Sequence, residues 1–103
     1  VSRTPLKPED FSHIRSAFLS AVAALKTKEN VEEFLQDFFT PSEWKMFLKR
    51  LAVAEMLLDG KSYDTMGAML KVSNTTIARM RTFLELHGTG LRKMIHQLKE
   101  RQK

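Results

Sequence analysis

Residues suited to contacting nucleic-acid bases gather in one short stretch of this 103-residue sequence. Short polar side chains and a methyl group stand there beside arginines. Small donors, acceptors and methyl groups suit base edges in a DNA groove, and arginine also suits phosphate. We therefore expect contacts with double-stranded DNA from Ser73, Asn74, Thr75, Thr76, Ala78, Arg79 and Arg81.

Two short helices joined by a tight connection would position these side chains. Lys71, Val72 and Ser73 form the connection. The hydroxyl of Ser73 can cap the second helix by accepting from the free amide of Thr75 or Thr76. The pattern predicts a helix-turn-helix with Val72 buried in its turn. Each helix has an inner face of apolar residues spaced three and four apart, namely Met66, Met69 and Leu70, and Ile77, Met80 and Leu84.

An ordinary helical hairpin in a small all-α protein is the alternative, because two amphipathic helices joined by a short turn are common. Gly67 favours the DNA-reading motif, since the first helix is expected to let the second cross closely there. The basic residues Arg79 and Arg81 favour it as well. Lys71 counts against it, because the left-handed turn position usually carries glycine and another residue there costs about 1 kcal/mol.

The positive charge of the chain lies in the same half as this motif. The net charge is +5. Residues 1–60 contribute −1, from eight lysines and arginines against nine acids, whereas residues 61–103 contribute +6, from nine against three. A solvated basic surface is the simplest explanation of such an excess. Its coincidence with the motif favours a polyanionic partner.

Nothing in the sequence favours an enzyme, a metal site or a cofactor. Cysteine is absent, and the three histidines, His13, His87 and His96, form no pair at helical ligand spacing. There is no Ser, His and acid arrangement and no glycine-rich phosphate loop. No apolar run approaches the ~20 residues of a membrane span, and no signal peptide is seen, so we expect no membrane partner and a cytoplasmic location.

Six helices and no strand are expected. A flexible arm over residues 1–8 precedes one helical domain over residues 9–103, which carries the helix-turn-helix at about 62–86. The first helix runs from about Pro8 to Lys26, and a capping arrangement at 30–33, with Asn30 as the cap, opens a short second helix. The last helix has an inner face of Leu91, Met94, Ile95 and Leu98.

The third helix has the clearest start signal, with Thr40 as N-cap, Pro41 at the first helical position and Glu43 three residues after the cap. It runs to about Asp59 and stops at Gly60. Apolar residues cover most sides of this helix, and alanines line the first helix. Burial against a second copy of the chain, in a homodimer, would cover both.

The ordered set of these features resembles the tryptophan repressor superfamily over about residues 10–98. The Gly60-Lys61-Ser62-Tyr63 segment and the ending from Leu84 to Gly88-Thr89-Gly90 are similar to the Trp-repressor-like group of small bacterial proteins. The residues that carry the wider resemblance are Phe39-Thr40-Pro41-Ser42-Glu43, Arg50, Glu55, Leu57-Leu58-Asp59-Gly60 and Ser73-Asn74-Thr75-Thr76-Ile77-Ala78-Arg79.

This resemblance implies an all-α, six-helix intertwined homodimer that binds double-stranded DNA and regulates transcription as a repressor does. The groove-facing positions of the family fall on Ser73, Asn74, Thr75, Thr76 and Ala78. Its corepressor-contacting positions fall on Thr40, Arg50 and Arg79.

Three departures from the family's pattern bear on function. Met80 replaces the glycine beside which the tryptophan repressor lodges its ligand, so tryptophan is not expected in a pocket formed by Thr40, Arg50, Arg79 and Met80. Lys71 replaces the turn glycine, and Asp64 replaces a phosphate-binding arginine. These two favour the alternative function, a protein-interaction or scaffold module with the same fold that does not read DNA. The leading hypothesis is a dimeric, sequence-specific DNA-binding regulator.

Overall fold

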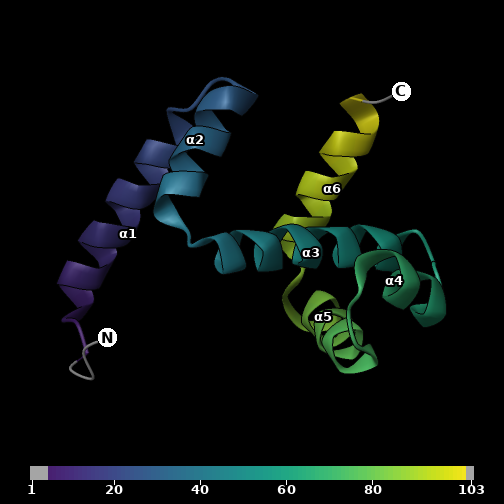
Figure 1. Cartoon of the computed structure of the whole chain (residues 1–103). Coiled ribbons are helices and arrows are strands. Elements are labelled where there is room, and N and C mark those ends of the chain that lie inside the picture. Colours follow the sequence, from purple (N-terminus) through teal and green to yellow (C-terminus); the bar gives the residue numbers. More distant parts are fainter. Residues whose placement is uncertain (1–4, 102–103) are drawn as a thin grey trace. The chain divides into compact units, whose positions relative to one another are not determined.

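Six α-helices and no strand make up the regular structure of residues 5–101, the part of the chain that the computed structural model describes (Figure 1). The all-α architecture expected from the sequence is therefore confirmed. The chain divides into two compact units, residues 1–40 and 41–103. Of the expected arm over residues 1–8, residues 1–4 lie outside the described part, and residues 5–7 precede the first helix without regular structure.

The first unit holds two helices, α1 (Pro8–Ala23) and α2 (Lys28–Phe38). The first helix stops short of Lys26. The Ala24 amide is shared between the carbonyls of Ser20 and Ala21, and the Leu25 amide bonds to the Val22 carbonyl three residues back, so the last turn tightens. The expected cap at Asn30 is wrong. Thr27 has the extended N-cap conformation, and its hydroxyl accepts from the Asn30 amide at 3.1 Å. Asn30 therefore lies inside the first turn of α2.

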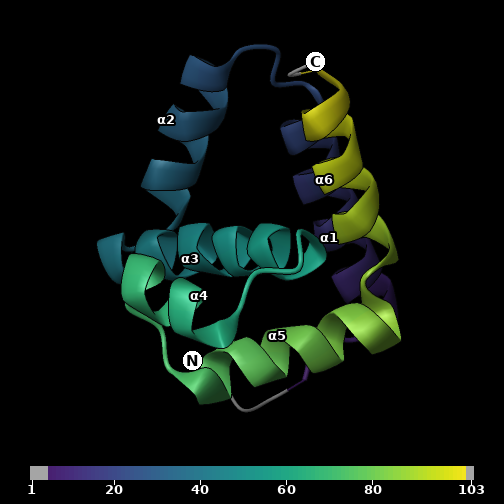
Figure 2. The same ribbon diagram turned by 90° about the vertical axis from the view of Figure 1, so that its right-hand side faces the viewer.

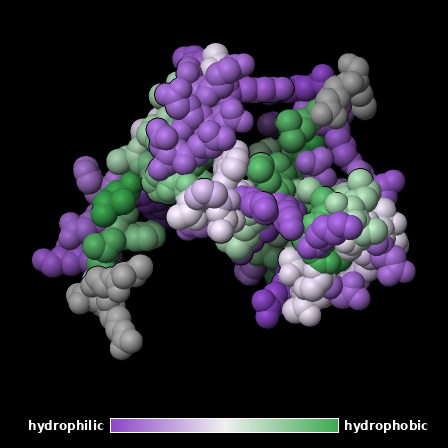
Figure 3. Space-filling view, viewed as in Figure 1, coloured by the Kyte–Doolittle hydropathy of each residue, from purple (hydrophilic) through white to green (hydrophobic). Residues whose placement is uncertain are grey.

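Phenylalanine rings join the two helices of the first unit. Phe18 lies 6.0 Å from Phe34 and 5.3 Å from Phe38, measured between ring centroids. No residue of α1 or α2 is buried, and Ile14 and Leu19 are 55% and 58% exposed. Figure 3 shows hydrophobic residues on the surface, in green, among hydrophilic residues in purple. An apolar surface of this kind typically marks an interface with another chain.

The second unit holds α3 (Pro41–Leu58), α4 (Tyr63–Leu70), α5 (Asn74–His87) and α6 (Thr89–Arg101). The predicted start of α3 at Pro41 is confirmed. Its predicted stop is also confirmed, because Gly60 adopts a positive φ of 78°. The amide of Gly60 donates to the Leu57 carbonyl at 3.1 Å and that of Lys61 to the Met56 carbonyl at 3.0 Å. These two bonds form a Schellman motif, which satisfies the last carbonyls of the helix.

The core of the second unit consists of two clusters that share the second half of α3. Figure 2 shows α4 and α5 on the same side of α3, with α6 running from the end of α5 past α3. Lys99 pairs with Asp59, which ties α6 to the end of α3. The first cluster consists of Val53, Met66 and Ile77, and the second of Ala54, Leu84 and Ile95. Val53 and Ala54, which are neighbours in α3, therefore belong to different clusters.

Five residues with expected apolar contacts are not covered within this unit. Met69 was placed on the inner face of α4, but it is 67% exposed, whereas Met66 is fully buried. Met94 of α6 is also exposed. The helix α3 is buried only in its second half, because Met46, Phe47 and Leu48 of its first half are exposed. The first half of α3 is therefore a separate uncovered apolar surface, in the second unit.

Gly88 is required at the corner between α5 and α6, and we expect Gly88→Ala to destabilise the protein by about 1–2 kcal/mol. A Cβ atom at this buried position would stand 2.8 Å from the Leu84 carbonyl oxygen and 2.9 Å from its Cα atom, so backbone atoms would have to move. Urea unfolding followed by circular dichroism measures the loss.

Gly90 supplies the matched control for this substitution. It lies in the first turn of α6, where a Cβ atom would meet nothing within 4 Å. Alanine has the higher helix propensity, so Gly90→Ala is expected to be neutral or to stabilise by up to about 1 kcal/mol. Equal losses in the two variants would show that the close packing at Gly88 is not the cause.

Candidate nucleic-acid interface

Both helices of the motif begin with a serine cap. The Ser62 hydroxyl accepts from the Thr65 amide at 3.1 Å, and the Ser73 hydroxyl accepts from the Thr76 amide at 3.1 Å. The predicted cap at Ser73 is therefore confirmed, with Thr76 as its partner. Each cap satisfies one of the free amides at a helix start, and so fixes where the chain turns into α4 and into α5.

The turn between α4 and α5 has the left-handed residue that the sequence predicted. Lys71 adopts φ 57° and ψ 47°, and its amide donates to the Gly67 carbonyl at 3.0 Å. Val72 follows it and packs half-buried against the core cluster of Val53, Met66 and Ile77. A lysine in this conformation costs about 1 kcal/mol relative to glycine. The packing of Val72 offsets part of that cost.

The prediction that Gly67 lets the second helix cross the first closely is wrong. A Cβ atom there would lie 3.4 Å from the Val72 carbonyl oxygen, which is at the edge of ordinary van der Waals contact. The nearest atom belongs to the turn and not to α5. A Cβ atom at position 67 is therefore not excluded by the crossing of the two helices.

The exposed side of α5 carries a shallow surface depression lined by Thr75, Ala78, Arg79 and Thr82. Asn74 and Thr76 are exposed beside it at the start of the helix. Of the residues expected to contact DNA, the depression thus brings together Thr75, Ala78 and Arg79. Thr82 was missed, although its place seven residues after Thr75 puts it on the same helical face.

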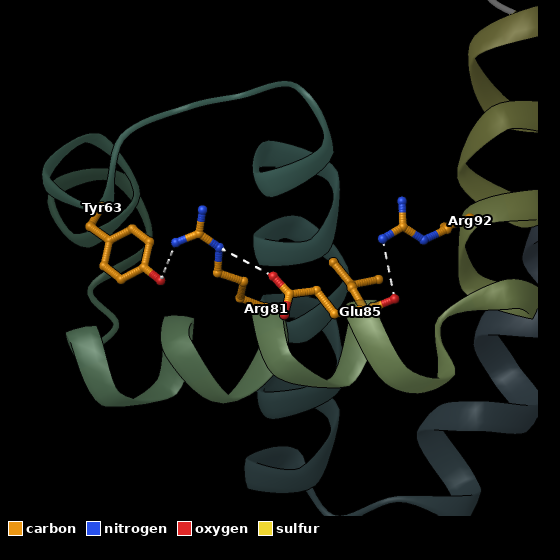
Figure 4. A network of polar contacts seen from close by, with 5 residues as sticks. Tyr63, Arg81, Glu85 and Arg92 are labelled. Atoms are coloured by element: carbon orange, nitrogen blue, oxygen red, sulfur yellow. Dashed lines mark hydrogen bonds and ion pairs between the residues drawn. The ribbon is translucent and has the colours of Figure 1, made fainter.

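Arg81 lies on a different flank of α5, beside the start of α4. Its Nη1 atom donates to the Tyr63 hydroxyl at 3.4 Å, and its guanidinium carbon lies 5.8 Å from the centre of the Tyr63 ring. Its Nε atom lies 3.8 Å from a carboxylate oxygen of Glu85 (Figure 4). Arg81 is therefore held by contacts within the unit, apart from the row of Thr75, Ala78 and Thr82.

Arg50, Arg79 and Met80, three residues of the expected ligand pocket, have different surroundings in the second unit. Met80 is half-buried and packs against both core clusters, whereas its neighbour Arg79 faces the exposed depression. The guanidinium of Arg50 lies 5.7 Å from the centre of the Phe47 ring on α3. Thr40 is an exposed residue of the first unit. A pocket formed by these four residues stays a prediction.

Asp64 lies in the first turn of α4 and is exposed. A carboxylate there interacts favourably with the positive end of the helix dipole. It would repel a DNA phosphate that approached the same helix start. Asp64 therefore favours the stability of α4 and disfavours a phosphate contact there, whereas the first turn of α5 carries no acidic residue.

Within residues 5–101, no helix is both long and apolar enough to cross a membrane. In the same part of the chain, no group of three or more His, Asp or Glu side chains is arranged to hold a metal ion.

Comparison with known proteins gives one result. A family model described as Trp repressor protein matches residues 15–99. The match includes the whole of α2, α3, α4 and α5 and most of α1 and α6. No curated protein matches the sequence.

Proposed function

The chain belongs to the Trp repressor family, and on that premise we propose that it binds double-stranded DNA at specific sites as a homodimer and represses transcription without sensing tryptophan. Proteins of this family are non-enzymatic regulators of transcription that bind DNA through a helix-turn-helix. The helices α4 and α5, with their turn at Lys71–Ser73, are that motif in this chain.

The observation that carries the proposal is the exposed start and outer face of α5. Ser73 caps the helix, and the side chains of Asn74, Thr75 and Thr76 follow it without an acidic residue in the first turn. A helix start of this kind attracts phosphate, and short polar side chains beside it can reach base edges in the major groove. Arg79 lies on the same face and supplies a cation for base or backbone.

A homodimer is supported by the apolar surface that one chain leaves exposed. Phe11 and Ile14 of α1 and Phe47 and Leu48 of α3 are about half exposed. We propose that a second copy of the chain covers these residues, as the intertwined dimers of the family imply. Two copies would also present two α5 helices, which is the arrangement that reads two half-sites on one DNA duplex.

DNA affinity is expected to fall as salt rises, because lysine and arginine contacts with phosphate release counterions. With about four to six such contacts per dimer, the logarithm of the affinity should fall against the logarithm of the salt concentration with a slope of about −4 to −5. Fluorescence anisotropy with a random duplex, repeated over a salt series, measures this slope. A salt-independent interaction, or no binding at duplex concentrations below millimolar, would favour the protein-interaction module. The exposed Asp64 favours that alternative as well.

Two variants of the α5 face separate base reading from phosphate contact in the same assay. Thr75→Ala is expected to lower the preference for a selected site over random duplex by about fivefold, the effect of losing one base contact of ~1 kcal/mol. Arg79→Gln is expected to weaken both duplexes and to reduce the salt slope by about one if it contacts phosphate. Lys26→Gln removes the same charge in the first unit and is the control.

A further inference from the structure

A second feature of the second unit is a partly enclosed cleft where the end of α3, the start of α4, the second half of α5 and the start of α6 come together. It lies apart from the depression on the outer face of α5, because the two share no lining residue. Its polar lining consists of Lys61, Tyr63, Arg81, Glu85 and Arg92, and its apolar lining includes Leu84.

Arg92 is the fixed cation of this cleft. Its Nη2 atom donates to the Leu84 carbonyl at 3.2 Å, which satisfies one of the last carbonyls of α5 (Figure 4). Its own backbone amide donates to the Gly88 carbonyl at 2.9 Å. A guanidinium has five N–H donors, so the bond to the Leu84 carbonyl leaves most of the Arg92 donors for another acceptor. No carboxylate within residues 5–101 forms an ion pair with Arg92.

Arg81 and Tyr63 line the same cleft as Arg92, and Figure 4 shows the Arg81 guanidinium extended toward Tyr63, on the far side of Glu85 from Arg92. The Arg81–Glu85 pair has a separation of 3.8 Å between side chains that are 60% and 65% exposed, so it is weak and screened by solvent. The bond from Arg81 to the Tyr63 hydroxyl, at 3.4 Å, is long. A stronger acceptor can displace both contacts, and the Tyr63 hydroxyl can then donate to it.

The side-chain charges of the cleft favour a ligand with negative charge. Lys61, Arg81 and Arg92 are opposed by the single carboxylate of Glu85, so the cleft carries an excess of positive charge. Arginine presents paired donors that match the oxygens of a phosphate. The apolar lining beside them, at Leu57, Leu58 and Leu84, would suit the carbon part of an ester.

We infer that this cleft binds a small organic phosphate ester, with Arg92 and Arg81 on the phosphate group and the leucines against the organic group. The location favours a small ligand over the DNA backbone, because the cleft is partly enclosed and Asp64 is exposed outside its lining, in the same first turn of α4 as Tyr63. A bound phosphate would connect the start of α6 to the middle of α5. The inference does not depend on DNA binding.

The test is a nuclear magnetic resonance titration of the full chain, at constant ionic strength, with phenyl phosphate and with inorganic phosphate. We expect saturable shifts of the backbone amides of Lys61, Tyr63 and Arg92 with both probes. Phenyl phosphate should bind about fivefold or more tightly than inorganic phosphate, because its ring covers apolar surface.

Three variants make the titration specific. Arg92→Gln and Arg81→Gln are each expected to weaken phenyl phosphate binding by about tenfold, since each removes a charge-assisted contact. Arg81→Gln leaves the bond between Arg92 and the Leu84 carbonyl intact, so it tests the site even if Arg92→Gln disturbs the α5–α6 corner. Lys93→Gln removes one charge from an exposed neighbour on α6 and is expected to change the affinity by less than about twofold.

The proposal is overturned if the shifts grow linearly without saturation, or if they spread equally over all basic residues. It is also overturned if Lys93→Gln weakens binding as much as Arg92→Gln. Saturation at Arg92 by duplex DNA alone, with no response to phenyl phosphate, would assign the cleft to the DNA backbone and would likewise reject a small-molecule site.

Discussion

Met66→Ala is expected to lower the free energy of unfolding by about 2–4 kcal/mol, because truncating a buried methionine removes its burial and leaves a cavity. Met66 is fully buried and is the only fully buried residue within α4. It packs with Val53 of α3 and Ile77 of α5, so one side chain holds the first helix of the motif to the other two. An eight-residue helix is marginal on its own. Loss of this contact should therefore loosen α4 before the rest of the unit.

Urea unfolding at one fixed protein concentration measures the loss, because a dimer's stability depends on concentration. Met69→Ala is the matched control, with the same residue type in the same helix. Met69 is 67% exposed, so the expected change is within about 0.5 kcal/mol. Similar losses in the two variants would contradict the assignment of Met66 as the anchor of α4.

The pair Met66 and Met69 also shows how far the sequence can predict this fold. Starts and stops of helices depend on a few neighbouring residues, so the cap at Ser73, the start at Pro41 and the stop at Gly60 were all predictable. The orientation of a two-turn helix is different. Met66, Met69 and Leu70 all fit helical spacing, and only the packing of α4 on α3 decides that Met69 faces outward.

Competition between neighbouring caps explains the error in α2. Thr27 and Asn30 are both good cap residues, three positions apart, so either could open a helix in this segment. The structure uses Thr27, and Asn30 becomes the residue whose amide is capped. A residue type favoured at caps is also tolerated in a first turn. The sequence pattern could not rank the two.

For the candidate site, the sequence predicts the helix more readily than the direction in which each of its side chains points. Arg79 and Arg81 were both expected at DNA, since both are cations on one short helix. Residues two apart on a helix do not face the same way. Arg79 lines the outer depression, whereas Arg81 contacts Tyr63 on the flank. The role of Arg92 could not be predicted, because it depends on the corner at Gly88 that brings α6 back to the Leu84 carbonyl.

L-tryptophan is expected neither to bind at physiological concentration nor to alter DNA affinity. The resemblance to the tryptophan repressor places Arg50 and Arg79 at ligand-contacting positions, and both are present in this chain. Both have another use here. The guanidinium of Arg50 lies over the Phe47 ring, and Arg79 lies on the proposed DNA-contacting face. The presence of the two arginines is therefore not sufficient reason to expect a tryptophan site.

Met80 is the main reason to expect that tryptophan does not bind. It packs against the cluster of Val53, Met66 and Ile77 and also against the cluster of Ala54, Leu84 and Ile95. A side chain shared by both halves of the core cannot move aside without opening both. Fitting a ligand against it would overpack the site, at a cost of about 1–3 kcal/mol, or roughly a tenfold to hundredfold loss of affinity. The core contacts of Met80 also hold α5 in place without any ligand.

Titration calorimetry with L-tryptophan on the native protein and on Met80→Gly tests this expectation. The native protein should show no binding up to millimolar tryptophan. The glycine variant loses core packing and helix propensity, so its fold must first be verified by circular dichroism, with Met80→Ala as an intermediate step. Micromolar binding to the native protein would show that Met80 does not block the site. Binding to the glycine variant alone would show that the Met80 side chain blocks the site. It would support a reading helix that the core contacts of Met80 hold in place without a ligand.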